Sequence, residues 1–277
     1  MSLALTRDSG GSTISALAGH TAKEGGVALL TSDEIEQFKT QGFLVFPGLL
    51  NERKQKRYMA IFSELVEKCQ GLKKDALPTW SLERDAEGKP IQGMLHKIQG
   101  VMVVDFRILD VAAEPEISGR VQSLIGQKLD VFGTKFFPKL AAGGTSVDWH
   151  QDNFYFKSES DDIVSCAIYY EGADRSNGCL RVVPGSHRSG ITEHERTGRT
   201  VIKGFRAKVD ESEALDVVCP PGTVVLFSAS LMHGTYDNES GAQGGRSRFS
   251  TAWHFVPAEM DLPPYNRGQY ADRHSIT

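Results

Sequence analysis

The sequence predicts a mainly β protein, an antiparallel sandwich or barrel with helices wrapped around it at the N-terminal end. Three observations lead to this prediction. Short runs rich in β-forming residues recur after Gly126, turn-forming pairs such as Asn177-Gly178 and Pro221-Gly222 separate them, and no helical pattern lies between them. A parallel α/β sheet would need such interleaved helices. Before Gly126, apolar residues instead recur at helical spacing.

Two predicted helices and a buried strand open the ordered part of the chain. Thr31 and Glu34 form the capping-box pair that begins the first helix, and Gly42 ends it. Phe43–Phe46 follows as a short buried strand. Asn51 can cap the second helix, and the apolar stripe of that helix is expected in the core: Tyr58, Ile61, Phe62 and Leu65.

The remaining elements follow in chain order. The polar stretch 73–93 is expected to be a surface loop, and a third helix is expected near 114–125. The predicted strands are 129–137, 163–170, 179–183, 217–219, 224–227 and 246–256. We expect one domain over 29–277, preceded by a flexible arm at 1–28 that is rich in Gly, Ser and Thr.

Composition excludes several classes of protein. The net charge of −4 and the hydrophobic content of 40% exclude general disorder and nucleic-acid binding through bulk charge. No run approaches the roughly 20 apolar residues that span a bilayer. Four cysteines without CxxC spacing indicate buried, reduced thiols, and the N-terminus lacks a secretory pattern. We therefore expect a soluble, cytoplasmic protein with no nucleic-acid or membrane partner.

His150, Asp152 and His233 are the candidate metal ligands. The first two are two residues apart on a predicted strand, so their side chains would leave the same face. A second histidine from a distant strand completes a two-His-one-carboxylate triad, which binds Fe(II) and leaves coordination positions open. His-x-Asp alone occurs easily by chance in a chain with eight histidines. His233 adds weight because it follows the turn and strand at 221–227.

Arg246 and Arg248 are candidate anion-binding residues. They alternate with bulkier residues in the predicted strand 246–256, so both would face the same way. A cation that points into a barrel needs an anion, because an unpaired buried charge is unfavourable. A small dicarboxylate bound bidentately would satisfy either arginine.

Three blocks of sequence together resemble the phytanoyl-CoA dioxygenase family. They are Val-Asp-Trp-His-Gln-Asp at 147–152, Asn-Gly-Cys-Leu-Arg-Val-Val-Pro-Gly-Ser-His at 177–187, and His-Gly-Thr at 233–235 with Asn238. The segment 38–48 is also similar to that family's N-terminus, so the likeness spans about residues 30–257. It implies a double-stranded β-helix (jelly-roll, cupin-like) fold. It also implies an oxygenase that uses Fe(II), 2-oxoglutarate and O2 and usually hydroxylates an unactivated C–H bond.

The resemblance also implies roles for single residues. His150, Asp152 and His233 match the iron ligands. Arg248 matches the arginine that binds the distal carboxylate of 2-oxoglutarate, because it stands six residues before His254-Phe255. The other positions matched to the co-substrate are Thr235, Lys97, Lys135 and Gln151. The insertion at 240–245 makes the gap from the second histidine to the arginine longer than usual in the family, so Arg246 stays an alternative.

Two other classes of function stay open. One is a non-catalytic jelly-roll binding module, which would not need the intact triad and a matched arginine together. The other is a metal-dependent hydrolase or isomerase, which would use the metal as a Lewis acid and need no dicarboxylate. A halogenase is disfavoured because Asp152 stands where those enzymes have a small residue. Measuring succinate formation separates these classes.

The substrate is expected to be a small free metabolite, because the sequence has no dense basic patch that indicates coenzyme A. The loops at 73–95, 153–162 and 188–213 are expected to frame the pocket. The sequence does not distinguish hydroxylation from desaturation or cyclisation. It does not indicate the oligomeric state either. Of the other histidines, His254 is the one most expected near the site, and His187 is expected to stabilise a loop.

Overall fold

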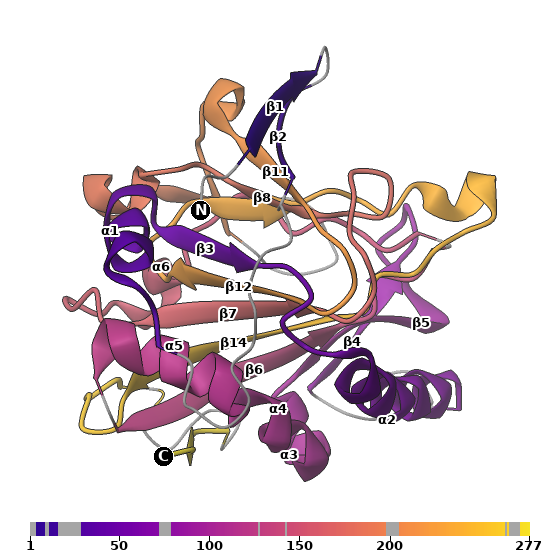
Figure 1. Ribbon diagram of the computed structural model, residues 1–277. Helices are drawn as coiled ribbons and strands as arrows, with labels where there is room; N and C mark the ends of the chain where they lie inside the picture. The colour runs from indigo at the N-terminus through magenta and orange to yellow at the C-terminus, as the bar shows by residue number, and fades with distance from the viewer. Residues whose placement is uncertain are drawn as a thin grey trace.

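Two β-sheets lie face to face, and helices cover the outer side of the larger sheet (Figure 1). The computed structural model describes residues 4–8, 11–15, 29–71, 79–126, 128–141, 143–197, 205–263, 265 and 272–277. Within them, the antiparallel sheets form the jelly-roll core that the sequence predicts, with the helices supplied by the N-terminal part of the chain.

The larger sheet is antiparallel throughout. Its strands in spatial order are β3 (Phe43–Phe46), β12 (Thr223–Ser228), β7 (Val164–Tyr169), β14 (Ser250–Pro257), β6 (Leu129–Phe137), β5 (Pro90–Gln99) and β4 (Trp80–Arg84), with β15 (His274–Ser275) also paired to β6. Every residue of β7 and β12 is buried. Both strands are therefore covered on both faces, by helices on one side and by the smaller sheet on the other.

The smaller sheet supplies one of the candidate metal ligands. Its order is β1 (Ala4–Asp8), β2 (Gly11–Ser15), β11 (Leu215–Val218), β8 (Leu180–Val182) and β13 (His233–Thr235), and only the β2–β11 pairing is parallel. A separate hairpin pairs β9 (His194–Arg196) with β10 (Phe205–Ala207). Single 3-10 turns lie at Phe106–Ile108, Ser186–Ser189, Glu211–Glu213 and Ser240–Gln243.

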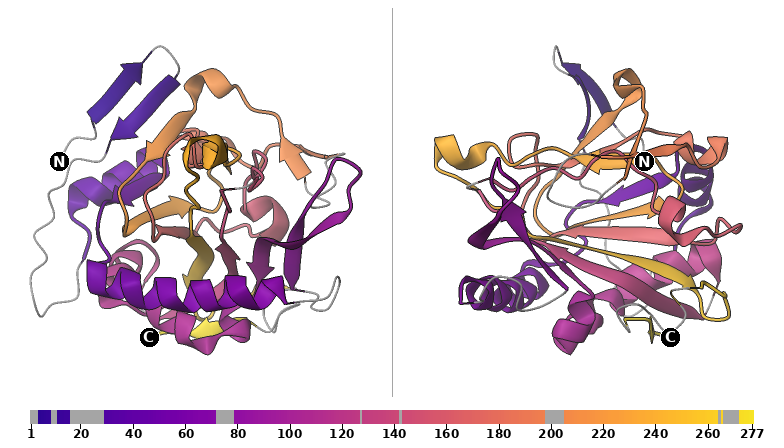
Figure 2. Two further views of the ribbon diagram at one scale, coloured as in Figure 1. Left: turned by 90° about the vertical axis from the view of Figure 1, so that its right-hand side faces the viewer. Right: turned by 180° about the vertical axis from the view of Figure 1, so that it is seen from behind.

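The helices are α1 (Ser32–Gln41), α2 (Glu52–Gln70), α3 (Val101–Val104), α4 (Leu109–Ala112), α5 (Pro115–Ile125) and α6 (Asn153–Phe156). All but α6 contribute apolar side chains to the main core cluster on the larger sheet, and Figure 2 shows α2 running along that sheet. Phe62 of α2 stacks on Phe136 of β6 at 4.5 Å between ring centroids and lies 4.7 Å from Tyr170. Aromatic burial of this kind stabilises the core beneath the sheet.

Several local predictions are confirmed. The capping box between Thr31 and Glu34 is present, and Gly42 ends α1 in the left-handed conformation at φ 84°. Asn51 caps α2, and its predicted apolar stripe is buried. All four cysteines are buried and free.

Two predictions of local structure are wrong. The stretch 73–93 is not a continuous surface loop, because the hairpin of β4 and β5 begins at Trp80 and turns between Asp85 and Lys89. The last long strand begins at Ser250 rather than at 246. Side-chain hydrogen bonds hold the chain before it: the Glu171 carboxylate accepts from the Phe249 amide.

Two boundary predictions stay open. Of the arm predicted at 1–28, the structure describes only β1 and β2, and the remaining residues lie outside the described ranges. Its predicted flexibility and the single domain over 29–277 stay predictions. None of the described helices has the length and apolar character needed to cross a membrane.

Candidate active site

His150, Asp152 and His233 meet in the space between the two sheets. Their ligand atoms all lie within 4.8 Å of one another. His233 begins β13, and His150 forms an isolated antiparallel bridge to it, with reciprocal backbone hydrogen bonds of 2.9 and 3.0 Å. Asp152 lies just before the short helix α6. The regular strand predicted for 150–152 is therefore wrong, but a bridge followed by a helical turn still brings the two side chains together.

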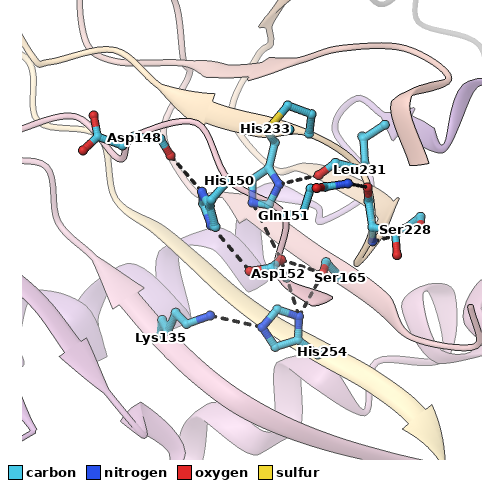
Figure 3. Close-up of polar contacts among 12 residues, drawn as sticks. Lys135, Asp148, His150, Gln151, Asp152, Ser165, Ser228, Leu231, His233 and His254 are labelled. Carbon is cyan, nitrogen blue, oxygen red and sulfur yellow. Dashed lines mark hydrogen bonds and ion pairs between the residues drawn. The ribbon is translucent and has the colours of Figure 1, made fainter. Parts of the chain in front are cut away.

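Backbone carbonyls fix the orientation of both imidazoles. Nδ1 of His150 lies 2.8 Å from the Asp148 carbonyl, and Nδ1 of His233 lies 2.9 Å from the Leu231 carbonyl (Figure 3). A carbonyl only accepts, so each Nδ1 carries the proton and each Nε2 keeps its lone pair. The Nε2 atoms lie 3.6 and 3.7 Å from the Asp152 carboxylate oxygens. Two neutral imidazoles and one carboxylate are the donors that non-haem Fe(II) takes, so these residues fit the metal.

A chain of hydrogen bonds leads from Asp152 to a lysine. Ser165 Oγ donates to Asp152 Oδ2 at 2.9 Å and also lies 2.9 Å from His254 Nδ1. His254 Nε2 in turn lies 3.1 Å from Lys135 Nζ (Figure 3). The ammonium can only donate, so His254 accepts at Nε2 and carries its proton on Nδ1.

The buried groups of this cluster have strongly shifted pKa values. Burial alone would raise the pKa of Asp152, but His254, His233 and His150 bring it well below its ordinary value. Burial lowers the pKa of His233 to about 4, helped by His150, and that of His254 to about 3, helped by Lys135. Asp152 is therefore ionised at pH 7 beside neutral His233 and His254, and an ionised carboxylate with a neutral imidazole is the state that a metal needs.

A cavity of about 790 Å³ opens beside the triad. The predicted co-substrate residues Lys97, Lys135, Thr235 and Arg248 all line it, together with the triad and His254. Burial, followed by repulsion from Lys135, lowers the pKa of Lys97 to about 8. Three cationic side chains that are distant in sequence, those of Lys97, Lys135 and Arg248, thus line the same cavity as the candidate metal ligands.

The structure separates the two arginines. Arg248 is 2% exposed, lines the cavity, and donates to the Gly178 carbonyl at 2.5 Å and to Ser250 Oγ at 3.0 Å. Its Nε has no hydrogen-bond partner, and no acidic side chain of the described residues forms an ion pair with it. Arg246 has a side chain that is 58% exposed and pairs with Asp174. The prediction that both face the same way is wrong, because neither lies in β14.

Lys139 is a buried residue that the sequence analysis missed. Its Nζ donates to Thr235 Oγ1 at 2.9 Å, to the Thr145 carbonyl at 3.1 Å and to the Tyr236 carbonyl. Burial, followed by repulsion from Arg248, lowers its pKa well below the ordinary value. The Val147 amide also donates to Thr235 Oγ1. The hydroxyl oxygen of Thr235 therefore accepts two hydrogen bonds, and its proton is available for donation to another group. No sequence motif marks this lysine.

Gln151 does not line the cavity, although the resemblance matches it to the co-substrate. Its amide nitrogen donates to the carbonyls of Gly190 and Ser230, and its amide oxygen accepts from the Thr192 amide. The amide group of Gln151 therefore joins the loop at 190–192 to the loop at Ser230 and does not contact the cavity. His187 also behaves as a loop residue, with Nε2 3.0 Å from the Lys39 carbonyl.

The sequence profile of the phytanoyl-CoA dioxygenase (PhyH) family matches residues 38–247. The match covers well over half of the chain and contains all three candidate metal ligands. The chain belongs to the phytanoyl-CoA dioxygenase family. It is accordingly an Fe(II)- and 2-oxoglutarate-dependent dioxygenase that oxidises a small molecule. Arg248 and His254 lie just beyond the matched range, so their assignment depends on the geometry described above.

Relatives with named activities are about a quarter identical in sequence to this chain over the aligned residues. The human peroxisomal phytanoyl-CoA dioxygenase is 25% identical over 241 residues, which are 83% of this chain and 70% of that protein. The L-proline trans-4-hydroxylase of Streptomyces griseoviridis is 26% identical over 228 residues, 74% of this chain and 80% of that protein.

Solved structures share the fold of this dioxygenase. EctD from S. alaskensis, with 2-oxoglutarate and 5-hydroxyectoine, superposes with a TM-score of 0.66 at 18% identity, covering 87% of this chain and 80% of that one. The 2-oxoglutarate-dependent carbocyclase SnoK from nogalamycin biosynthesis gives 0.65 at 20% identity, covering 89% and 90%. At these identities the likeness shows the jelly-roll fold alone.

Proposed function

We propose that the protein hydroxylates a C–H bond of a small free metabolite, with His150, Asp152 and His233 holding Fe(II) and Arg248 binding 2-oxoglutarate. One observation carries the proposal: the three ligand atoms converge at a cavity that also contains Arg248, a buried cation with no acidic partner among the described residues. A buried guanidinium without a counter-ion is unfavourable, and a carboxylate bound in the cavity removes that cost.

Each residue around the metal has a task in this proposal. Bound Fe(II) supplies the oxidative decarboxylation of 2-oxoglutarate by O2, which releases succinate and CO2 and delivers one oxygen atom to the C–H bond. His150 and His233 are held in the ligating tautomer by backbone carbonyls. Asp152 is held by Ser165, so its orientation does not depend on the metal alone.

The other cavity residues orient the co-substrate. Arg248 fixes its distal carboxylate, with Thr235 as a neighbouring hydroxyl donor on the same wall. Lys97 and Lys135 supply charge for the remaining oxygens of the co-substrate and for other anionic groups in the cavity. A cavity whose polar groups are already in position places the co-substrate before reaction, which is the contribution a protein makes to cofactor chemistry.

We propose that the substrate is a free metabolite rather than a macromolecule or an acyl-CoA. The cavity of about 790 Å³ has the size that takes a small molecule. The net charge of −4 does not favour nucleic acid as a partner. We also propose the cytoplasm as the compartment, since all four cysteines are free thiols.

Succinate formation tests the proposed function. The Fe(II)-loaded protein, incubated with 2-oxoglutarate, O2 and a metabolite library, should produce succinate faster with at least one library member. Mass spectrometry should then find that compound heavier by one oxygen atom. Chemical conversion of the compound without succinate formation would favour a hydrolase or isomerase. Co-substrate binding without any turnover across the library would favour a binding module.

A further inference from the structure

His96 enters the cavity because of an irregularity in the β4–β5 hairpin. Ser81 pairs with Lys97, whereas the next residue, Leu82, pairs with Leu95, so β5 has one extra residue at His96. Consecutive residues of a regular strand point to opposite faces, but a bulge turns an extra side chain toward its neighbour's side. Both His96 and Lys97 accordingly line the cavity. A bulge beside an active site that redirects one side chain indicates a functional position.

A buried carboxylate holds the imidazole of His96 from behind. Glu83 is 2% exposed, and its Oε1 lies 2.9 Å from His96 Nδ1. Thr145 completes the cluster, because its amide donates to Glu83 Oε1 at 3.0 Å and its hydroxyl to Oε2 at 2.8 Å. Burial alone would raise the pKa of Glu83, but the hydrogen bond and charge of His96 lower it below the ordinary value. Glu83 is thus an ionised acceptor, and Nδ1 of His96 is its donor.

The other nitrogen of His96 has no partner. Nε2 is buried and makes no hydrogen bond within the described residues, although the side chain is only 3% exposed. Among the described residues, His96 is the one group within ion-pair distance of Glu83, so a second proton on its ring would be balanced by that buried carboxylate. With both ring nitrogens protonated, Nε2–H is a buried donor that lacks an acceptor among the described residues until a ligand supplies one.

The surroundings of Nε2 favour an anionic acceptor. Lys97 and Lys135 line the same cavity, and no acidic side chain of the described residues forms an ion pair with either. With Arg248 and the metal site, they give the cavity more positive charge than the two carboxylates of 2-oxoglutarate neutralise. Asp148 and Asp237, the other acidic residues on the wall, are half-buried and exposed, so water screens their charge.

We infer that His96, held by Glu83, donates a hydrogen bond from Nε2 to a carboxylate of the small-molecule substrate, and that the enzyme therefore selects carboxylic acids over their neutral analogues. The inference rests on the proposed function and names the substrate class of the same cavity. Glu83 is a positioning residue that acts through His96.

Two substitutions at His96 separate substrate binding from structural support. Asn in place of His96 puts its amide nitrogen near the position of Nδ1, so it keeps the bond to Glu83 but has nothing at Nε2. Gln reaches the position of Nε2 and keeps a donor there. His187→Gln is the matched control, because His187 lies outside the cavity and bonds to the Lys39 carbonyl.

The experiment is calorimetric titration without turnover. The protein is loaded with Fe(II) and 2-oxoglutarate under anaerobic conditions and titrated with acetate through octanoate, benzoate, phenylacetate and L-proline, each paired with its primary amide. We expect at least one acid to bind tenfold or more tightly than its amide. His96→Asn should abolish that preference, His96→Gln should keep part of it, and His187→Gln should leave it unchanged.

The outcomes distinguish this inference from the proposed function. Failure of the wild-type protein to bind 2-oxoglutarate would overturn the proposed function and this inference with it. Normal 2-oxoglutarate binding with equal affinity for acids and amides, or with no binding of either, would overturn the inference alone. So would a full acid preference in His96→Asn, since that variant retains only the contact to Glu83.

Discussion

Replacing Arg248 by Met tests the assignment of the co-substrate site most directly. The change removes the guanidinium and its charge and keeps an unbranched side chain in place of the aliphatic part of Arg248. Loss of one partner of a buried, hydrogen-bonded charge pair costs about 2–5 kcal/mol, which is about 30- to several-thousand-fold in affinity. Arg246→Met is the matched control. Its side chain is 58% exposed and pairs with Asp174 at the surface, so its loss should change 2-oxoglutarate affinity by less than about 1 kcal/mol.

The assay is anaerobic calorimetric titration of 2-oxoglutarate into the Fe(II)-loaded variants. Arg248 also donates to Gly178 and Ser250, so thermal unfolding of each variant is measured alongside to separate weak binding from partial unfolding. A folded Arg248→Met protein that binds 2-oxoglutarate like the wild type would refute the reasoning. A larger loss in Arg246→Met would move the site to that arginine.

Three further substitutions probe the metal site and its supports. His233→Ala should lose stoichiometric Fe(II) binding and the visible band formed with 2-oxoglutarate, and full iron content by metal analysis would remove His233 from the ligand set. Lys139→Met should lower the free energy of unfolding by roughly 1–3 kcal/mol, because it leaves buried acceptors unpaired; an unchanged urea midpoint would contradict this. Gly133→Ala should lower Tm more than Gly48→Ala, because both glycines have φ near 60° but only at Gly133 would a Cβ lie 2.9 Å from the imidazole of His254. Equal Tm shifts would mean that this contact relaxes freely.

The elements that the sequence predicts well are those set by local chemistry. The capping box at Thr31 and the left-handed Gly42 fix both ends of α1, and the apolar stripe of α2 places that helix on the sheet. The strand predicted at 129–137 coincides with β6, in which most residues are apolar, aromatic or β-branched. The three candidate metal ligands also meet as their spacing and order indicate.

The elements that the sequence misses depend on tertiary contacts. The hairpin of β4 and β5 lies at the edge of the larger sheet, where polar residues are tolerated, so its composition resembles that of a loop. The start of β14 depends on a hydrogen bond from Phe249 to Glu171, which no alternation of residue types reveals. The bulge at His96 likewise depends on how β4 and β5 pair. Two of the three groups that Lys139 bonds, the Thr235 hydroxyl and the Tyr236 carbonyl, are more than 90 residues away in sequence.

The hydrogen-bond chain from Lys135 through His254 and Ser165 to Asp152 links the two halves of the active site thermodynamically. Every donor in it points toward the carboxylate, so a change at one end alters the electrostatic potential at the other. An anion that draws the Lys135 ammonium away from His254 would remove one donor from this series and change how strongly Asp152 attracts a cation. Linkage is reciprocal, so occupancy of the metal position must alter co-substrate affinity by the same factor. The strength of the coupling between the metal and the co-substrate therefore depends on these four residues as well as on the ligands themselves.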